Sequence, residues 1–274
     1  MRSSKIMAIF LLVISATAYA QKLPKVQEAG LRAPDNIKID GKPTEWKNRL
    51  QAYNPSAGLF YTIANDDNNL YLVVQVTPEN SNDELLINKI LRGGLTLTIQ
   101  KTGKKDDKNA IAITYPVSNY AFSLHLHDYK SGKIADTASV QTATARVEKN
   151  NKLMEQQIKY IGIKGVSGVD SLISIYNENN IKVAGLFDFN KGYTLELSLP
   201  LKYLDLSAGN EPKFAYHIIL NGYKRPPTMG QPRNQDGTPA TGPEIDRMMA
   251  IFAQMDAAAS ARTDFWGEYT LAKK

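Results

Sequence analysis

The chain has 274 residues, with 33 Lys and Arg against 27 Asp and Glu, so its formal net charge is +6. Hydrophobic residues make up 43% of the chain, which is typical of a globular protein and argues against disorder. The sequence has no Cys, which excludes disulfides, Cys-ligated metal centres and thiol catalysis. Lys and Arg are scattered, except around Lys101–Lys108, where they indicate a solvated hairpin loop. A nucleic-acid partner is therefore not expected.

Residues 1–20 predict a secretory signal peptide. Arg2 and Lys5 precede an apolar run over 6–14, and Ala18-Tyr19-Ala20 matches the small-x-small pattern of a cleavage site. The apolar run is shorter than the roughly 20 residues that a membrane span needs, and no later run is longer. We therefore expect a secreted or periplasmic protein without a membrane span after cleavage. An uncleaved anchor is the alternative.

After a short extension over 21–36, the pattern is one of strands separated by turns. Alternate residues of 70–76 are apolar, which predicts a strand with one buried face. The segment 58–64 precedes it through an Asn- and Asp-rich stretch over 65–69, and those residue types favour a turn. The two segments therefore predict a hairpin. A calcium loop at Asp66-Asp67 is the alternative, although the spaced ligands of a calcium motif are missing.

A helix is predicted over 83–92, because the segment has helical spacing and stops at Gly93-Gly94. Some helix is also expected within 137–149. Short segments rich in β-branched and aromatic residues predict further strands. These strands are expected over 95–100, 110–115, 122–129, 157–163, 171–176, 181–188, 193–199, 214–221 and 265–271.

The last part of the chain departs from this pattern of strands and turns. Residues 222–243 hold five Pro and four Gly and predict a long irregular loop. A helix follows over 244–259, and we expect its apolar stripe to pack against the sheet. That stripe consists of Ile245, Met248, Met249, Phe252 and Met255. The excess of strands predicts an all-β fold, an antiparallel β-sandwich of jelly-roll or immunoglobulin-like type with a long loop and a late helix.

Three blocks of the chain form a recognisable set. In the first, an apolar strand runs into Asp40-Gly41 and then Glu45-Trp46; the second is the hairpin over 61–76, and the third is Asp-Phe-Trp-Gly-Glu-Tyr at 264–269. Together these blocks resemble family-9 carbohydrate-binding modules and the wider group of DOMON-like sandwiches. The resemblance implies one sandwich domain over 37–274 that stacks a sugar on aromatic rings.

The residues of these blocks also have a structural interpretation. Asp40-Gly41 predicts a tight turn with a positive φ at the glycine. Trp46 is expected to close the base of the sandwich, and Trp266 to plug its core or edge. A sugar-binding platform would then have to come from Tyr residues.

Candidate binding residues lie in two places. The loop after 214–221 offers Tyr223, Arg225 and Arg233, with Asn221 at its root, and Tyr129 is a further ring candidate. A ring and bidentate donors suit a sugar or an acidic group, and a plain surface loop held by Pro is the alternative.

A metal site is the second candidate. His125 and His127 share one face of the expected strand 122–129 and can chelate a metal if His217 or Asp128 converges on them. The alternative is a half-exposed polar face of a sheet. No cofactor is expected.

The sequence lacks the common motifs of hydrolases, phosphate loops, zinc proteases and dinucleotide-binding enzymes, so catalysis is not expected. It predicts a secreted, non-catalytic binding module for a carbohydrate or a glycan-like ligand. The alternative is a structural or protein-interaction component of the bacterial cell envelope, which would use its sheet edges or its late helix without binding sugar.

Overall fold

The computed structural model describes residues 23–47, 50–77, 83–117, 137–188, 192–210, 212–224, 234 and 236–274. The predicted leader and the expected strand over 122–129 lie outside these ranges. The same is true of five predicted site residues, which are His125, His127, Tyr129, Arg225 and Arg233.

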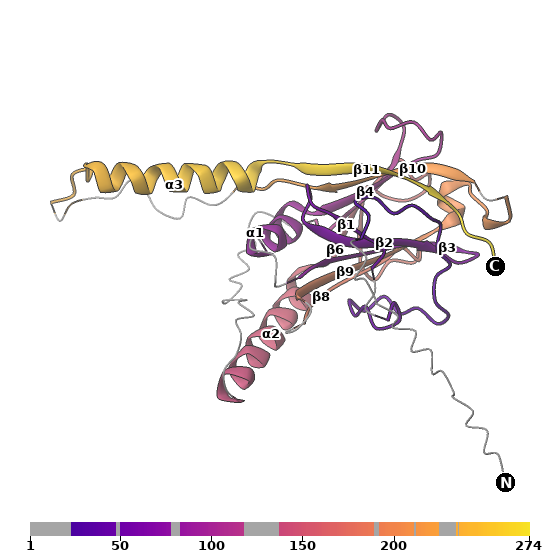
Figure 1. Ribbon diagram of the computed structural model, residues 1–274, viewed down its shortest axis with the longest axis horizontal. Helices are drawn as coiled ribbons and strands as arrows, with labels where there is room; N and C mark the ends of the chain where they lie inside the picture. The colour runs from indigo at the N-terminus through magenta and orange to yellow at the C-terminus, as the bar shows by residue number, and fades with distance from the viewer. Residues whose placement is uncertain are drawn as a thin grey trace, which may run out of the picture.

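The described residues form two sheets, and all the pairings between their strands are antiparallel (Figure 1). The five-stranded sheet has the order β1-β2-β3-β9-β8 and the six-stranded sheet the order β11-β10-β4-β5-β6-β7. The predicted antiparallel β-sandwich is confirmed.

Apart from β1, which was not predicted, the described strands overlap the segments predicted from the sequence. The five-stranded sheet consists of β1 (Ala52–Asn54), β2 (Leu59–Asn65), β3 (Asn69–Val76), β8 (Lys182–Asp188) and β9 (Gly192–Pro200). The six-stranded sheet consists of β4 (Leu95–Gln100), β5 (Ile111–Tyr115), β6 (Tyr160–Lys164), β7 (Leu172–Ser174), β10 (Lys213–Leu220) and β11 (Thr263–Thr270).

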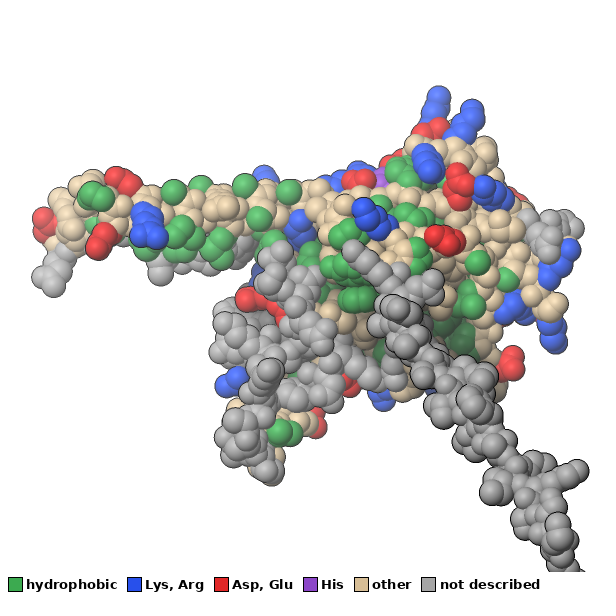
Figure 2. All heavy atoms as spheres, viewed as in Figure 1, with side chains coloured by type: hydrophobic (Ala, Val, Ile, Leu, Met, Phe, Trp, Pro, Cys, Tyr) green, Lys and Arg blue, Asp and Glu red, His purple; other side chains and the backbone are tan. Residues whose placement is uncertain are grey.

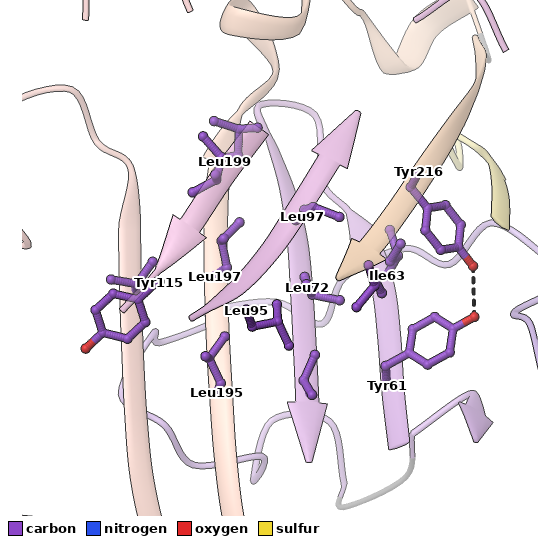
Figure 3. Close-up of a cluster of buried hydrophobic side chains, with 14 of the residues drawn as sticks. Tyr61, Ile63, Leu72, Leu95, Leu97, Tyr115, Leu195, Leu197, Leu199 and Tyr216 are labelled. Carbon is purple, nitrogen blue, oxygen red and sulfur yellow. Dashed lines mark hydrogen bonds between the residues drawn. The ribbon is translucent and has the colours of Figure 1, made fainter. Parts of the chain in front are cut away.

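The main core lies between the two sheets, where every second side chain of each strand points inward. Leu72 and Leu197 of the five-stranded sheet and Leu95 and Leu97 of the six-stranded sheet belong to it, all fully or almost fully buried (Figure 3). Burying an aliphatic side chain of this size contributes about 1.5–3 kcal/mol, so the alternating strands supply the main stabilisation of the fold.

One polar pair crosses this core. The hydroxyls of Tyr61 on β2 and Tyr216 on β10 are 2.9 Å apart and share a hydrogen bond, as Figure 3 shows. The Tyr61 hydroxyl also accepts the backbone N–H of Gln27 at 2.9 Å. Burial raises the pKa of Tyr61, although the hydrogen bonds from Tyr216 and Gln27 act to lower it. Both hydroxyls are thus satisfied without water.

The segment before β1 covers the outer face of the five-stranded sheet. Its Trp46 packs edge-on against Tyr71, with ring centroids 6.3 Å apart, in a small cluster separate from the main core. The expectation that Trp46 closes the base of the sandwich is therefore wrong. The tryptophan instead fastens the N-terminal segment to the back of the sheet.

Asn65 at the end of β2 ties three parts of the chain together. Its side-chain nitrogen donates to the carbonyl of Ala272 at 3.0 Å, and its side-chain oxygen accepts the N–H of Ala272 at 2.8 Å. The Tyr269 hydroxyl of β11 lies 3.0 Å from the same oxygen, and the N–H of Asn65 donates to the carbonyl of Leu31 at 3.0 Å. A buried side chain with this many partners joins the N-terminal segment, β2 and β11.

The turn between β2 and β3 forms as its sequence predicts. One carboxylate oxygen of Asp66 accepts the N–H groups of Asn68 and Asn69 at 2.7 and 2.6 Å, and the other accepts the Tyr71 hydroxyl at 2.5 Å. Burial acts to raise the pKa of Asp66, but these hydrogen bonds outweigh it and lower the pKa. The carboxylate is thus engaged by donors of its own turn.

Two of the helices lie against the sandwich. α1 (Asp83–Asn88) continues into a π-helical turn, η1 (Lys89–Gly93), and ends at Gly94 with φ +81°, so the predicted stop is confirmed. α2 (Thr137–Gln157) is longer than the expected helical stretch and packs on β8. Two short 3₁₀ helices, η2 (Leu201–Leu204) and η3 (Ala208–Asn210), connect β9 to β10.

α3 (Pro243–Ser260) is the predicted late helix, but it does not pack on a sheet. Figure 1 shows it extending away from the body of the molecule. Met249 and Met255 are 40% and 46% exposed, so the expectation that the methionine stripe packs against the sheet is wrong. The C-terminal turn attaches the helix, because Ala259 is buried and its carbonyl accepts the N–H of Tyr223 at 3.0 Å.

No helix in the described part of the chain is long and apolar enough to cross a membrane.

Candidate ligand-binding groove

The outer face of the six-stranded sheet carries two rows of side chains that run across its strands. Cross-strand pairing places Trp266, His217, Thr98, Ala112 and Lys164 side by side, in what we call the Thr98 row. The neighbouring Thr96 row consists of Asp264, Ile219, Thr96, Thr114 and Gly162. Both rows follow from strand alternation, because their members stand opposite the inward leucines and isoleucines.

A groove of about 380 Å³ opens over the middle of these rows. Its floor is low because the residues there are small, with Ala112 and Gly162 beside the threonines. The hydroxyls of Thr96 and Thr114 are 2.8 Å apart and share a hydrogen bond. The floor therefore offers a line of hydroxyl groups to a polar ligand, and Lys164 adds a positive charge at its end.

His217 is held between two carboxylates beside the groove. Its Nδ1 lies 3.0 Å from an oxygen of Asp107, and its Nε2 lies 3.0 Å from an oxygen of Asp264. Both ring nitrogens thus face carboxylate oxygens. His217 is 2% exposed, and the half-exposed polar face expected for 122–129 lies outside the described residues.

Asp264 also accepts a hydrogen bond from the Nε of Arg262 at 2.8 Å. Burial acts to raise the pKa of Asp264, but hydrogen bonds from His217 and Arg262, together with their charges, outweigh it and lower the pKa. The carboxylate of Asp264 is therefore shared by His217 and Arg262. Asp107, which belongs to the loop between β4 and β5, also lines the groove and brings that loop against it.

Trp266 stacks on the ring of His217. Its indole and the His217 ring are 4.1 Å apart between centroids, with 17° between their planes. Trp266 is partly exposed on the outer face of the edge strand β11, so it is not a core plug; of the two predicted places, the edge is the one it occupies. The inward positions beside it belong to Phe265 and to Gly267, whose missing side chain leaves room for the Tyr216 ring.

The predicted loop residues that the structure describes lie at the end of β10. The side-chain nitrogen of Asn221 donates to the carbonyl of Gly94 at 3.0 Å and to the hydroxyl of Thr96 at 2.9 Å. Asn221 thus adjoins the Thr96 row, where it fixes the backbone. The ring of Tyr223 lies against Arg92, with the guanidinium carbon 5.7 Å from its centroid. The structure does not place either residue among those that line the groove.

The nitrogens of His217, the predicted third metal ligand, already face the oxygens of Asp107 and Asp264. No group of three or more His, Asp or Glu that could hold a metal ion is found among the residues the structure describes. His125 and His127 lie outside those residues.

On the opposite face of the sandwich, Glu196 of β9 holds the Asp40-Gly41 turn and Trp46 in place. Its carboxylate accepts the N–H groups of Asp40 and Gly41 at 3.1 and 2.9 Å and the indole N–H of Trp46 at 3.1 Å. Gly41 has φ +80°, as predicted, and an added Cβ would lie 2.6 Å from the Cβ of Leu186. Burial raises the pKa of Glu196 to about 7, against the effect of these three hydrogen bonds.

No protein-family model matches the sequence, and no curated protein matches it.

Proposed function

We propose that this protein is an exported, non-catalytic binding module for a carbohydrate, and that the groove on the six-stranded sheet is its binding site. The observation that carries the proposal is the hydroxyl-lined floor of the groove. The partly exposed indole of Trp266 does not line the groove but stands beyond His217 at the end of the same Thr98 row, where a longer ligand could reach it. The resemblance of the Asp40-Gly41, Trp46 and 264–269 blocks to carbohydrate-binding modules supports it.

The chemistry of the groove suits a sugar. Threonine hydroxyls donate and accept hydrogen bonds, as sugar hydroxyls do, and an aromatic ring presents a flat face to the C–H groups of a pyranose. His217 stacks on Trp266 and is itself held by Asp107 and Asp264. The ring is therefore fixed before the ligand arrives, which lowers the entropy cost of binding.

Retention on insoluble polysaccharides tests this proposal. The chain from Gln21 onward would be screened against a panel of polysaccharides, and the Trp266→Ala variant compared on those that retain it. Loss of a stacking ring worth about 1.5 kcal/mol should weaken binding about tenfold. Tyr176→Ala is the matched control, because Tyr176 is an exposed aromatic outside the groove.

Two results would contradict the assignment. If Trp266→Ala is retained as strongly as the unchanged protein, the binding site does not extend along the Thr98 row to the indole. If no polysaccharide retains the protein at all, the carbohydrate proposal fails.

A second candidate function is an interaction component of the cell envelope, and α3 is the observation that favours it. Met249, Ile251 and Met255 are exposed on a helix that extends from the body (Figure 2). Replacing these three residues by Ser should abolish co-purification with an envelope protein while leaving the sandwich folded. Unchanged co-purification would argue against this use of α3.

A further inference from the structure

A second, larger hollow lies on the outer face of the five-stranded sheet. Its volume is about 760 Å³, within the range of roughly 300–1,000 Å³ that is usual for small-molecule sites. One side is the N-terminal segment around Lys38, and the other is formed by the turn before β3 and the connection after β9. The groove described above lies on the other sheet, so the two sites are separate.

The floor of the hollow follows from strand register. Tyr71 on β3, Ser198 on β9 and Lys182 on β8 stand side by side across three strands. Tyr71 is nearly buried, and its hydroxyl donates to Asp66 at 2.5 Å, so its ring is fixed in position. The floor thus offers a rigid ring edge, a hydroxyl and an ammonium group in one line.

The walls combine apolar and polar side chains. Ile37 and Ile39 line one side, while Asn68, Asn180 and Ser207 supply amide and hydroxyl groups. Such a mixture suits a ligand with both hydroxyl groups and C–H surface. A fatty acyl chain would leave the amides without partners, and burying unpaired polar groups is costly.

The charge of the hollow is strongly positive. Lys38, Lys182 and Lys202 line it and are exposed, and none of them forms an ion pair with a carboxylate in the described part of the chain. Asp67 is the carboxylate among the described lining residues, and Arg32 already pairs with it at 2.8 Å. Three ammonium groups around one concave site raise the local concentration of anions.

We infer that this hollow binds a short saccharide that carries carboxylate groups, such as an oligomer of a uronic acid. The lysines would pair with the carboxylates, the amides and hydroxyls with the sugar hydroxyls, and the isoleucines would cover the ring C–H groups. This site does not depend on the groove or on Trp266, and its test is independent of the function proposed above.

Isothermal titration calorimetry with trigalacturonic acid tests the inference. The key variant is Lys38→Gln/Lys182→Gln/Lys202→Gln. The matched control is Lys104→Gln/Lys224→Gln/Lys274→Gln, which changes the net charge equally at exposed positions outside the hollow. We expect the dissociation constant to rise at least tenfold in the first variant and to change less than twofold in the second. Circular dichroism would check that both variants fold.

Two further ligands separate the contribution of the carboxylate charge from that of the sugar rings. The methyl ester of trigalacturonic acid keeps the sugar rings but loses the charge, and we expect at least tenfold weaker binding. Glutarate carries carboxylates without a ring, and we expect no displacement of the trisaccharide at equal concentration. Trp266→Ala should bind trigalacturonic acid normally, even if it is no longer retained on the polysaccharide found in the screen.

Several outcomes would overturn the inference. Equal weakening in both lysine variants would mean that only the overall charge attracts the ligand. Equal binding of the methyl ester, or displacement by glutarate, would show that the site does not recognise an acidic saccharide. Unchanged binding in the first variant, or no binding of trigalacturonic acid, would remove the hollow as a site.

Discussion

Replacing Glu196 by Gln should remove much of the pH dependence of stability between about pH 5 and 8. Glu196 is buried beneath the Asp40-Gly41 turn, and burial raises the pKa of its carboxyl from 4.5 to about 7. Between those two pH values the folded protein therefore binds more protons than the unfolded chain. The free energy of unfolding must fall as the pH rises through this interval.

The size of the effect follows from the two pKa values. Each unit between the unfolded value of 4.5 and the folded value of about 7 corresponds to about 1.4 kcal/mol, so the loss is about 3 kcal/mol. That contribution is fully present below pH 4.5 and is lost as the pH passes 7. Gln cannot titrate, so the variant lacks this slope. Its amide nitrogen also faces N–H donors, which lowers its stability at every pH by about 1–3 kcal/mol.

Urea denaturation at half-unit pH steps measures both quantities. The comparison is between slopes, because every titratable group other than Glu196 is common to both proteins. Glu148→Gln, at an exposed position on α2, is the control and should keep the slope of the unchanged protein. If Glu196→Gln and the unchanged protein lose the same stability between pH 5 and 8, the burial of an ionisable Glu196 is not the cause.

Three further changes probe neighbouring contacts. Trp46→Phe removes the indole donor to Glu196, so the pKa of Glu196 should rise and the midpoint of the pH-dependent loss should move to higher pH in the same denaturation series. Tyr216→Phe removes the hydrogen bond to the Tyr61 hydroxyl and should cost about 1 kcal/mol by urea denaturation; no loss would mean that this core bond contributes nothing. Gly267→Ala would place a Cβ 2.1 Å from the Tyr216 ring and should cost about 1–3 kcal/mol or more, measured as a lower melting temperature; an unchanged melting temperature would contradict the tight packing.

Local patterns in the sequence predicted the strands well, because alternation of apolar residues directly records one buried face. β3 and β4 are the clearest cases, and Asp40-Gly41 and Gly93-Gly94 also form the turn and the stop that their residue types favour. The methionine stripe of α3 shows the limit of such patterns. An apolar stripe predicts that one side of a helix is covered, but it does not specify what covers that side, and Met249 and Met255 are exposed in this structure.

The candidate groove was harder to predict, because distant residues form it. Asp107, His217 and Asp264 meet only through the register of β10 with β11 and the position of the loop after β4. One signal was nevertheless present in the sequence. The alternating threonines Thr96 and Thr98 mark the outward face of β4, and Asn221, predicted as a ligand residue, adjoins that face.

The bonds of Asn65 also constrain when this protein can fold. Asn65 lies early in the chain, yet its side chain is satisfied by Tyr269 and Ala272, more than 200 positions later. In a polypeptide emerging N-terminus first, the side chain of Asn65 therefore appears long before Tyr269 and Ala272, its late partners. Pairings this distant in sequence favour slow folding. The contacts of Asn65 with Tyr269 and Ala272 can therefore form only after β11 has been synthesised, which makes them a late step in the assembly of the fold.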